Sequence, residues 1–147
     1  MNHKIVELSD FNVVGMEYVG KNENEEIGAM WEVFLERQNE IEAPNNAITY
    51  GVSYHMDMSG NISYIAGLKV ATVSNLPNGM KSILVPAGKF AVFTYKGDIK
   101  DISNFWNQIY SQYLPELKLQ PANRIPFEYY DERFCQDGEL YIYIPIE

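Results

Sequence analysis

The chain has 147 residues, of which 20 are Asp or Glu and 11 are Lys or Arg, so its formal charge is −9. Hydrophobic residues make up 46% and aromatic residues 14% of the sequence, which is ample for a packed domain and excludes a disordered polymer. The acidic balance argues against direct nucleic-acid binding, because contact with phosphates needs a local excess of Lys and Arg.

Residues that bind soft metals are scarce. Cys135 is the single cysteine, and His3 and His55 are the only histidines, so we expect no metal site, no cofactor and no intramolecular disulfide. The first residues lead directly into alternating polar and apolar positions, and no apolar run approaches the length of a membrane-spanning helix. These features predict a soluble, cytoplasmic protein without membrane contact.

Two similar segments organise the chain. Residues 4–20 have the pattern of two strands, and residues 81–97 repeat this pattern with Tyr18 matched by Tyr95, 77 residues later. Because a duplication changes how every later segment is interpreted, it is the first feature to establish. We therefore predict two copies of one structural unit.

A helix is predicted after each of these segments. Apolar residues recur at spacings of three, four, seven and eight over residues 27–35 and again over residues 102–113, which is typical of a helix with one buried face. The only two tryptophans, Trp31 and Trp106, occupy matching places in these helices. Pro115 should interrupt the second helix, because proline lacks a backbone donor and clashes with the preceding turn.

Strands are predicted after each helix. Apolar residues alternate with polar ones over residues 48–54, which favours a half-buried strand. The spacing of 77 residues then aligns Gly51 with Glu128, and the final strands align Ile62 with Leu140. Each copy therefore has the order strand, strand, helix, strand, strand.

These elements predict an α+β fold in a single domain over residues 1–147. The first repeat covers about residues 1–76 and the second about residues 80–147, with turn-forming residues between them. Both helices should lie on an antiparallel sheet, because each has only one apolar face.

Five segments in a fixed order identify a family resemblance. They are Tyr64–Val70, Val85–Phe93, the helix that contains Trp106, Phe127–Tyr130 and Ile142–Ile146. Together they resemble the GyrI-like effector-binding domain, which accompanies AraC-type and MerR-type multidrug regulators and also occurs alone. The resemblance implies two βαββ units in a GyrI-like or SOUL-like arrangement, related by a pseudo-two-fold axis, with a central cleft for lipophilic, often cationic, small molecules. It implies a stand-alone binding protein related to drug sensing in transcription regulation.

Glu128 is the first candidate for a site residue. It lies in a strand between Phe127 and the pair Tyr129 and Tyr130, where a carboxylate loses hydration and should have a raised pKa. A bound cation would favour the charged form, and aromatic faces would add cation–π attraction. The resemblance implies that this residue lies deep in the cleft as a counter-charge. The alternative is a solvent-facing glutamate on a half-exposed strand.

Four aromatic residues are further candidates for ligand binding. We expect Trp106 and Tyr143 to form walls of the same cleft as Glu128, and Tyr64 and Tyr50 to orient a polar group of the ligand. Ordinary packing in the core is the alternative for each, since aromatic residues at helical or strand spacing are usually buried. Gly51 either opens one side of the cleft for the ligand or marks a β-bulge.

Two other classes of function remain as alternatives. The resemblance extends to hydrolases, in which Glu128 would act as a general acid or base, although a non-catalytic binder is the main expectation. His55, Asp57 and Cys135 do not form a recognisable nucleophile motif. The acidic surface alternatively suggests a basic protein partner.

Overall fold

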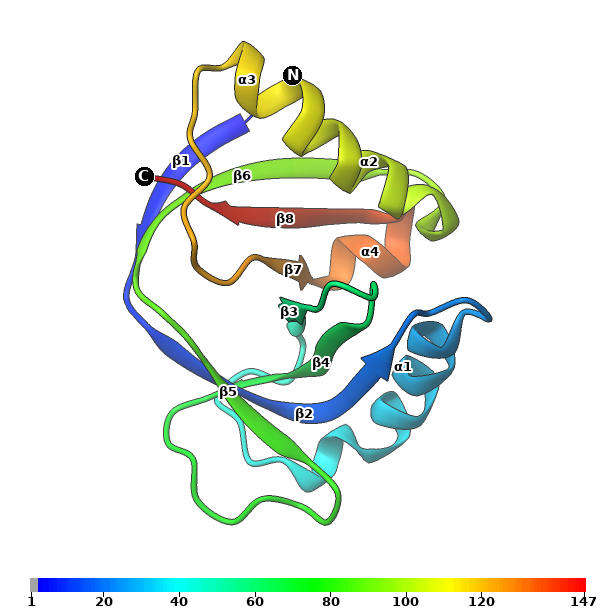
Figure 1. Cartoon of the computed structure of the whole chain (residues 1–147). Helices are drawn as coiled ribbons and strands as arrows, with labels where there is room; N and C mark the ends of the chain where they lie inside the picture. The colour runs from blue at the N-terminus through cyan, green and yellow to red at the C-terminus, as the bar shows by residue number, and fades with distance from the viewer. Residues whose placement is uncertain (1–2) are drawn as a thin grey trace.

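The computed structural model describes residues 3–147, which form one sheet of eight strands in the order β1-β6-β8-β7-β3-β4-β2-β5. All neighbouring strands are antiparallel, and Figure 1 shows that the sheet is curled, with β7 and β3 near its middle. The strands are β1 (His3–Leu8), β2 (Phe11–Gly20), β3 (Thr49–Met56), β4 (Ile62–Val70), β5 (Lys81–Val85), β6 (Gly88–Lys96), β7 (Phe127–Tyr130) and β8 (Glu139–Pro145).

Helices connect the second and third strands of each repeat. The first repeat has α1 (Glu26–Arg37), followed by the short 3-10 turn Gln38–Glu40. The second has the 3-10 turn Ile99–Asp101, α2 (Ile102–Gln108), the π-helical turn Ile109–Tyr113 and α3 (Leu114–Glu116), and α4 (Glu132–Asp137) lies between β7 and β8. None of the helices in residues 3–147 is both long and apolar enough to cross a membrane.

The strand order has the symmetry of a duplicated fold. Exchanging β1 with β5, β2 with β6, β3 with β7 and β4 with β8 reverses the order and leaves it otherwise unchanged, so the pseudo-two-fold axis passes between β3 and β7. The first strand of each repeat pairs with the other repeat, because β1 lies beside β6 and β5 beside β2. The α+β fold of two related units is thereby confirmed, while Met1 and Asn2 of the first repeat lie outside the described residues.

The strand register corrects one part of the sequence alignment. Tyr18 pairs with Tyr64 in the first repeat, and its counterpart Tyr95 pairs with Leu140 in the second. Tyr64 is therefore the structural counterpart of Leu140, whereas the sequence aligned Ile62 with that position. A shift of two residues keeps the same face of the strand, so the error does not change which side chains are buried.

The second helix changes its winding before Pro115 and ends one residue after it, close to the predicted stop. The chain stays helical from Ile102 to Glu116, but five residues before Leu114 have the wider π-helical winding, with the Leu114 amide donating to the Ile109 carbonyl. Pro115 lies in the first turn of α3, where the missing N–H costs little. The helix ends at Glu116, immediately after the proline.

The two faces of the sheet carry different cores. On one face α1 buries Phe34 against β2 and β4, and α2 buries Phe105 against β6 and β8. The opposite face carries a third cluster, in which Tyr50, Phe90 and Phe127 take part. Successive residues of a strand point to opposite faces, so each central strand contributes to both environments.

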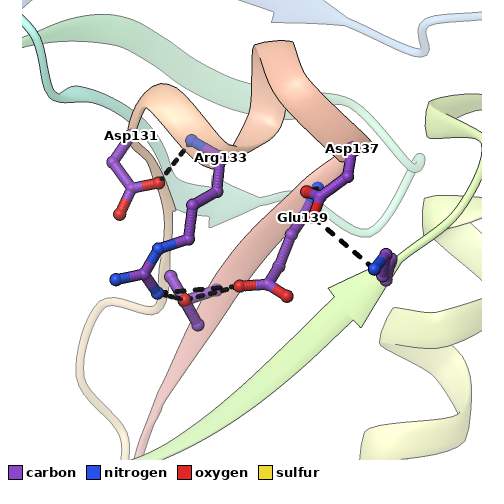
Figure 2. A network of polar contacts seen from close by, with 6 residues as sticks. Asp131, Arg133, Asp137 and Glu139 are labelled. Atoms are coloured by element: carbon purple, nitrogen blue, oxygen red, sulfur yellow. Dashed lines mark hydrogen bonds and ion pairs between the residues drawn. The ribbon is translucent and has the colours of Figure 1, made fainter.

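A surface network holds α4 beside β8 (Figure 2). The Asp131 carboxylate caps the helix by accepting from the Arg133 amide at 3.0 Å. The Arg133 guanidinium lies 3.6 Å from Glu139, and Lys96 of β6 lies 3.5 Å from Asp137. Exposed ion pairs contribute little stability individually, so the cap at Asp131 is the clearest reason for the start of α4 directly after β7.

Replacing two glycines, Gly28 and Gly67, with alanine should change the stability of the protein in opposite directions. Gly28 lies on the exposed side of α1 with nothing near a new Cβ, whereas a Cβ on Gly67 would overlap the Val14 carbonyl oxygen and lie 2.7 Å from a methyl group of Val13. We expect Gly28→Ala to raise the free energy of unfolding by about 0.5–1 kcal/mol. Gly67→Ala should lower it by about 1–3 kcal/mol or more.

Urea unfolding followed by circular dichroism measures both changes. A Gly67→Ala protein as stable as the wild type would contradict the close contact between β2 and β4.

Candidate functional site

Glu128 is the one charged residue that the described part of the chain buries, with an exposed fraction of 7%. Its oxygen Oε1 accepts hydrogen bonds from the hydroxyls of Tyr64 (2.9 Å) and Tyr130 (2.8 Å), and Oε2 accepts one from the indole Nε1 of Trp106 (2.9 Å). The donors come from β4, β7 and α2 respectively. Two elements that are distant in sequence, β4 and α2, therefore converge on a carboxylate of β7.

Trp31 of α1 completes this arrangement. Its Nε1 donates to the Tyr64 hydroxyl at 3.0 Å, and its ring meets the edge of Tyr130 with ring centroids 5.3 Å apart. The two tryptophans thus approach the carboxylate from equivalent helices, Trp106 directly and Trp31 through Tyr64. We call Glu128, Tyr64, Tyr130, Trp31 and Trp106 the Glu128 cluster.

Gly51 lies directly opposite Glu128 in the β3–β7 register, at the pseudo-two-fold axis. A Cβ on Gly51 would overlap the Tyr64 hydroxyl and lie 2.6 Å from Oε1 of Glu128. The interpretation of Gly51 as a bulge is wrong, because the irregularity in β3 lies between Ser53 and His55. The space beside the glycine is taken by the hydrogen bond between Tyr64 and Glu128.

Burial determines the protonation of the cluster. Loss of hydration raises the pKa of Glu128, and the bonds from Tyr130, Trp106 and Tyr64 lower it by less than burial raises it. Burial followed by the nearby carboxylate raises the pKa values of Tyr64 and Tyr130 well above the usual range, so both hydroxyls stay protonated as donors.

The carboxylate lacks a positive partner. Among residues 3–147 no Lys, Arg or His forms an ion pair with Glu128; the ion pairs there involve surface residues. Each carboxylate oxygen can accept about two hydrogen bonds, and Oε2 accepts only the bond from Trp106. The site therefore combines an anion, flanking aromatic rings and a spare acceptor position, which together suit an organic cation.

The structure separates the predicted aromatic candidates into two groups. Trp106 and Tyr64 contact Glu128 as described, but Tyr143 and Tyr50 lie on the opposite face of the sheet, where their ring centroids are 4.5 Å and 5.8 Å from that of Phe127. The expectation that Tyr143 lines the same cleft as Glu128 is wrong, and Tyr50 does not reach it either. Phe127 and Glu128 are adjacent in β7 and so point to opposite faces.

Two members of the cluster were missing from the predicted site. Tyr130 lies two residues after Glu128 in the same strand, so β alternation alone places both side chains on one face. Trp31 occupies the place in α1 that Trp106 occupies in α2, and the duplication was the available signal. Its contact with Tyr64 joins the first repeat to the site of the second.

The alternative nucleophile residues have other roles or surroundings. Asp57 accepts hydrogen bonds from the amides of Ser59 and Asn61 in a turn, and Cys135 is exposed on α4. Within residues 3–147 no three His, Cys, Asp or Glu side chains gather where one metal ion could bind them.

Comparison with known proteins identifies relatives over the full length of the chain. The model of the Cass2 family, described as integron-associated effector binding protein, matches residues 4–146. The transcriptional regulator BrlR of Pseudomonas aeruginosa is 39% identical over 151 residues, which cover 99% of this chain and 56% of BrlR. The chain thus spans little more than half the length of this regulator.

Solved structures share the fold. The structure of SAV2435 bound to tetraphenylphosphonium matches with a TM-score of 0.77 at 15% identity. The match covers 100% of this chain and 94% of the SAV2435 chain. An integron cassette protein from the mobile metagenome of Vibrio cholerae has a TM-score of 0.69 at 22% identity, covering 99% and 95%. The predicted resemblance to GyrI-like effector-binding domains is confirmed by these matches together.

The raised pKa of Glu128 predicts a specific pH dependence of stability. The folded state holds this proton more tightly than the unfolded chain, so the contribution of Glu128 to the free energy of unfolding falls as the pH rises from 4.5, its ordinary pKa, through its folded pKa. Glu128→Gln removes this titration. The stability of the variant relative to the wild type should therefore increase over that pH window.

Urea unfolding at several pH values measures the difference. The control is Glu116→Gln, which changes an exposed carboxylate on α3 and the net charge by the same amount. A constant difference between Glu128→Gln and the wild type at all pH values would contradict the burial of an ionisable group.

Proposed function

The chain belongs to the family of integron-associated effector-binding proteins, and from this premise we propose that it binds lipophilic organic cations against the carboxylate of Glu128. The observation that carries the proposal is a buried carboxylate with neutral donors, aromatic neighbours and no positive partner within residues 3–147. The neighbouring structure of SAV2435 holds tetraphenylphosphonium, a cation of this class.

The energetics favour a cation that is poorly hydrated. A compact ion such as ammonium loses strong hydration when it enters a buried site, whereas a lipophilic cation with delocalised or shielded charge loses less and also buries apolar surface. The negative carboxylate supplies Coulomb attraction at low effective dielectric. Each indole face adds about 0.5–2 kcal/mol of cation–π attraction. Charge and apolar area should therefore contribute to the affinity together.

Trp106 is the residue that we expect the ligand to displace. Tyr64 is buried with an exposed fraction of 4%, while Trp106 is only half-buried, and its indole donates the single hydrogen bond to Oε2. Moving this indole exposes one oxygen of Glu128 and leaves the two tyrosine bonds to Oε1 in place. The indole then becomes free to pack on the ligand.

The proposal concerns small-molecule recognition. The matched region makes up 56% of BrlR, a transcriptional regulator. We therefore propose that this chain performs the ligand-sensing part of such regulation. Control of transcription would require a DNA-binding element in addition to the matched region, since the acidic charge of −9 opposes direct contact with phosphates.

Removing the negative charge tests the role of Glu128. We expect Glu128→Gln to weaken the binding of tetraphenylphosphonium by about tenfold or more, because a buried counter-charge contributes upwards of roughly 1.4 kcal/mol. Isothermal titration calorimetry measures the affinity, and Glu116→Gln is the matched control, expected to bind like the wild type. Equal affinity for wild type and Glu128→Gln would refute the counter-charge.

A separate incubation distinguishes binding from hydrolysis, with a lipophilic cation that carries an ester as the ligand. Mass spectrometry should recover this ligand unchanged, whereas a product that Glu128→Gln fails to form would support the role of Glu128 as an acid–base group.

Cation binding should also depend on pH. The ligand needs the ionised form of Glu128, whose pKa is raised by burial, so affinity should increase as the pH rises through that pKa and become constant above it. Binding below this pKa should release a proton, which titrations in buffers of different ionisation enthalpy detect. An affinity that does not vary with pH in the wild type would contradict the proposal.

A further inference from the structure

A hollow lies on the face of the sheet opposite the Glu128 cluster. It has a volume of about 800 Å³. Its floor consists of aromatic side chains from four strands, namely Phe11, Tyr50, Phe127, Tyr129 and Tyr143. None of these residues belongs to the Glu128 cluster, and the sheet itself separates the two places.

The rings of the floor present both faces and edges. Phe127 and Tyr143 are stacked with centroids 4.5 Å apart and planes at 15°, while Phe11 meets Phe127 at 84° and Tyr50 meets Tyr129 at 90°. Aromatic rings prefer offset stacking and edge-to-face contacts with further rings. The floor is therefore suited to a flat aromatic molecule.

Three tyrosine hydroxyls of the floor have no hydrogen-bond partner within residues 3–147. They belong to Tyr50, Tyr129 and Tyr143, whereas the buried hydroxyls of Tyr64 and Tyr130 both donate to Glu128. Burial raises the pKa of each of the three, and in Tyr50 the neighbouring Tyr129 and Tyr143 raise it further. All three thus remain protonated donors in the neutral pH range, available to an acceptor in the hollow.

Charged residues lie only at the rim of the hollow. Glu7, Asp10 and Lys69 line it and are exposed to solvent, and the Lys69 ammonium lies 5.2 Å from the centroid of the Phe11 ring. The floor has no charged side chain that could compensate an ion, and burial of an uncompensated charge is strongly unfavourable. The floor therefore offers a cation no buried counter-charge, unlike the Glu128 cluster.

We propose that this hollow is a second ligand site, which binds an uncharged planar aromatic molecule with carbonyl or ether oxygens. The ring system packs on the partly exposed rings of Tyr129 and Tyr143, and its oxygens accept hydrogen bonds from the free tyrosine hydroxyls. The site differs from the Glu128 site in position, in charge and in the hydrogen-bonding groups that it offers. It does not rest on the proposed binding of cations.

Nile red, an uncharged planar dye with a carbonyl oxygen, is the probe. Its fluorescence is titrated with the wild-type protein and with the double variant Tyr129→Phe and Tyr143→Phe, which keeps both rings and removes two donors. We expect saturable binding to the wild type with one dye per chain. The double variant should bind about five- to 150-fold more weakly, the loss expected for two hydrogen bonds.

A blocking variant tests the position of the dye. Ala71 lines the hollow and is exposed, so Ala71→Trp should occlude it without changing the core and abolish saturable binding. Glu128→Gln is the control, because it alters the opposite face and should leave Nile red binding unchanged. Thermal unfolding by circular dichroism checks that each variant is folded, and Asn45→Trp, also on the rim, replaces Ala71→Trp if that protein is unfolded.

Several results would overturn the proposal. Absence of saturable binding to the wild type would do so, as would unchanged binding in both the double variant and a folded rim variant. Loss of Nile red binding in Glu128→Gln would place the dye at the other site and would equally reject the second one. Failure of tetraphenylphosphonium to bind, with Nile red bound as expected, would affect only the proposed function.

Discussion

A single carboxylate held by neutral donors is the interaction on which the site depends. Withdrawing an ionised carboxylate from water costs several kcal/mol in a protein interior, while hydrogen bonds to a charged group return about 1.5–3 kcal/mol each. Glu128 receives three such bonds, and its pKa is nevertheless raised. Desolvation therefore outweighs the hydrogen bonds, and the ionised form remains short of compensation. The cation that we propose as ligand would supply this compensation, which would link the cost of burial to a selectivity for charge.

The glycine at the equivalent position of the first repeat explains why the axis carries only one carboxylate. Because Gly51 and Glu128 are equivalent residues that face each other across the axis, a symmetric site would place two carboxylates side by side, and their repulsion would keep one of them protonated. Glycine at position 51 removes the second carboxylate and leaves room for the Tyr64 hydroxyl. The counterpart of Tyr64 in the second repeat is Leu140, so the donor is also present only once. The fold is nearly symmetric, but the polar chemistry at its axis is not.

The sequence predicts the duplication, the two helices and the central glutamate because these depend on local periodicity and on residue type. The face that a side chain occupies follows from counting along its strand. This rule could have excluded Tyr50 from the site, because it is adjacent to Gly51, and could have added Tyr130, which lies two residues after Glu128. Tyr143 was not accessible in this way, since its face is set by the register of β8 against β7. The exchange of β1 and β5 between the repeats was also hidden, because alternation identifies a strand without identifying its neighbour.

The alternation of side chains in β7 gives one short segment two kinds of recognition. Glu128 and Tyr130 point toward the helices, while Phe127 and Tyr129 point toward the aromatic hollow. The backbone of the sheet separates the charge of Glu128 on one face from the uncharged rings on the other. A cation in the hollow would therefore lie across the sheet from the Glu128 carboxylate and would lose hydration without direct compensation from it. An uncharged ligand at the Glu128 cluster would gain no Coulomb attraction from the carboxylate and would have to displace the indole of Trp106 that donates to it. Under the two proposals, the same four residues of β7 would therefore contribute to two different ligand preferences.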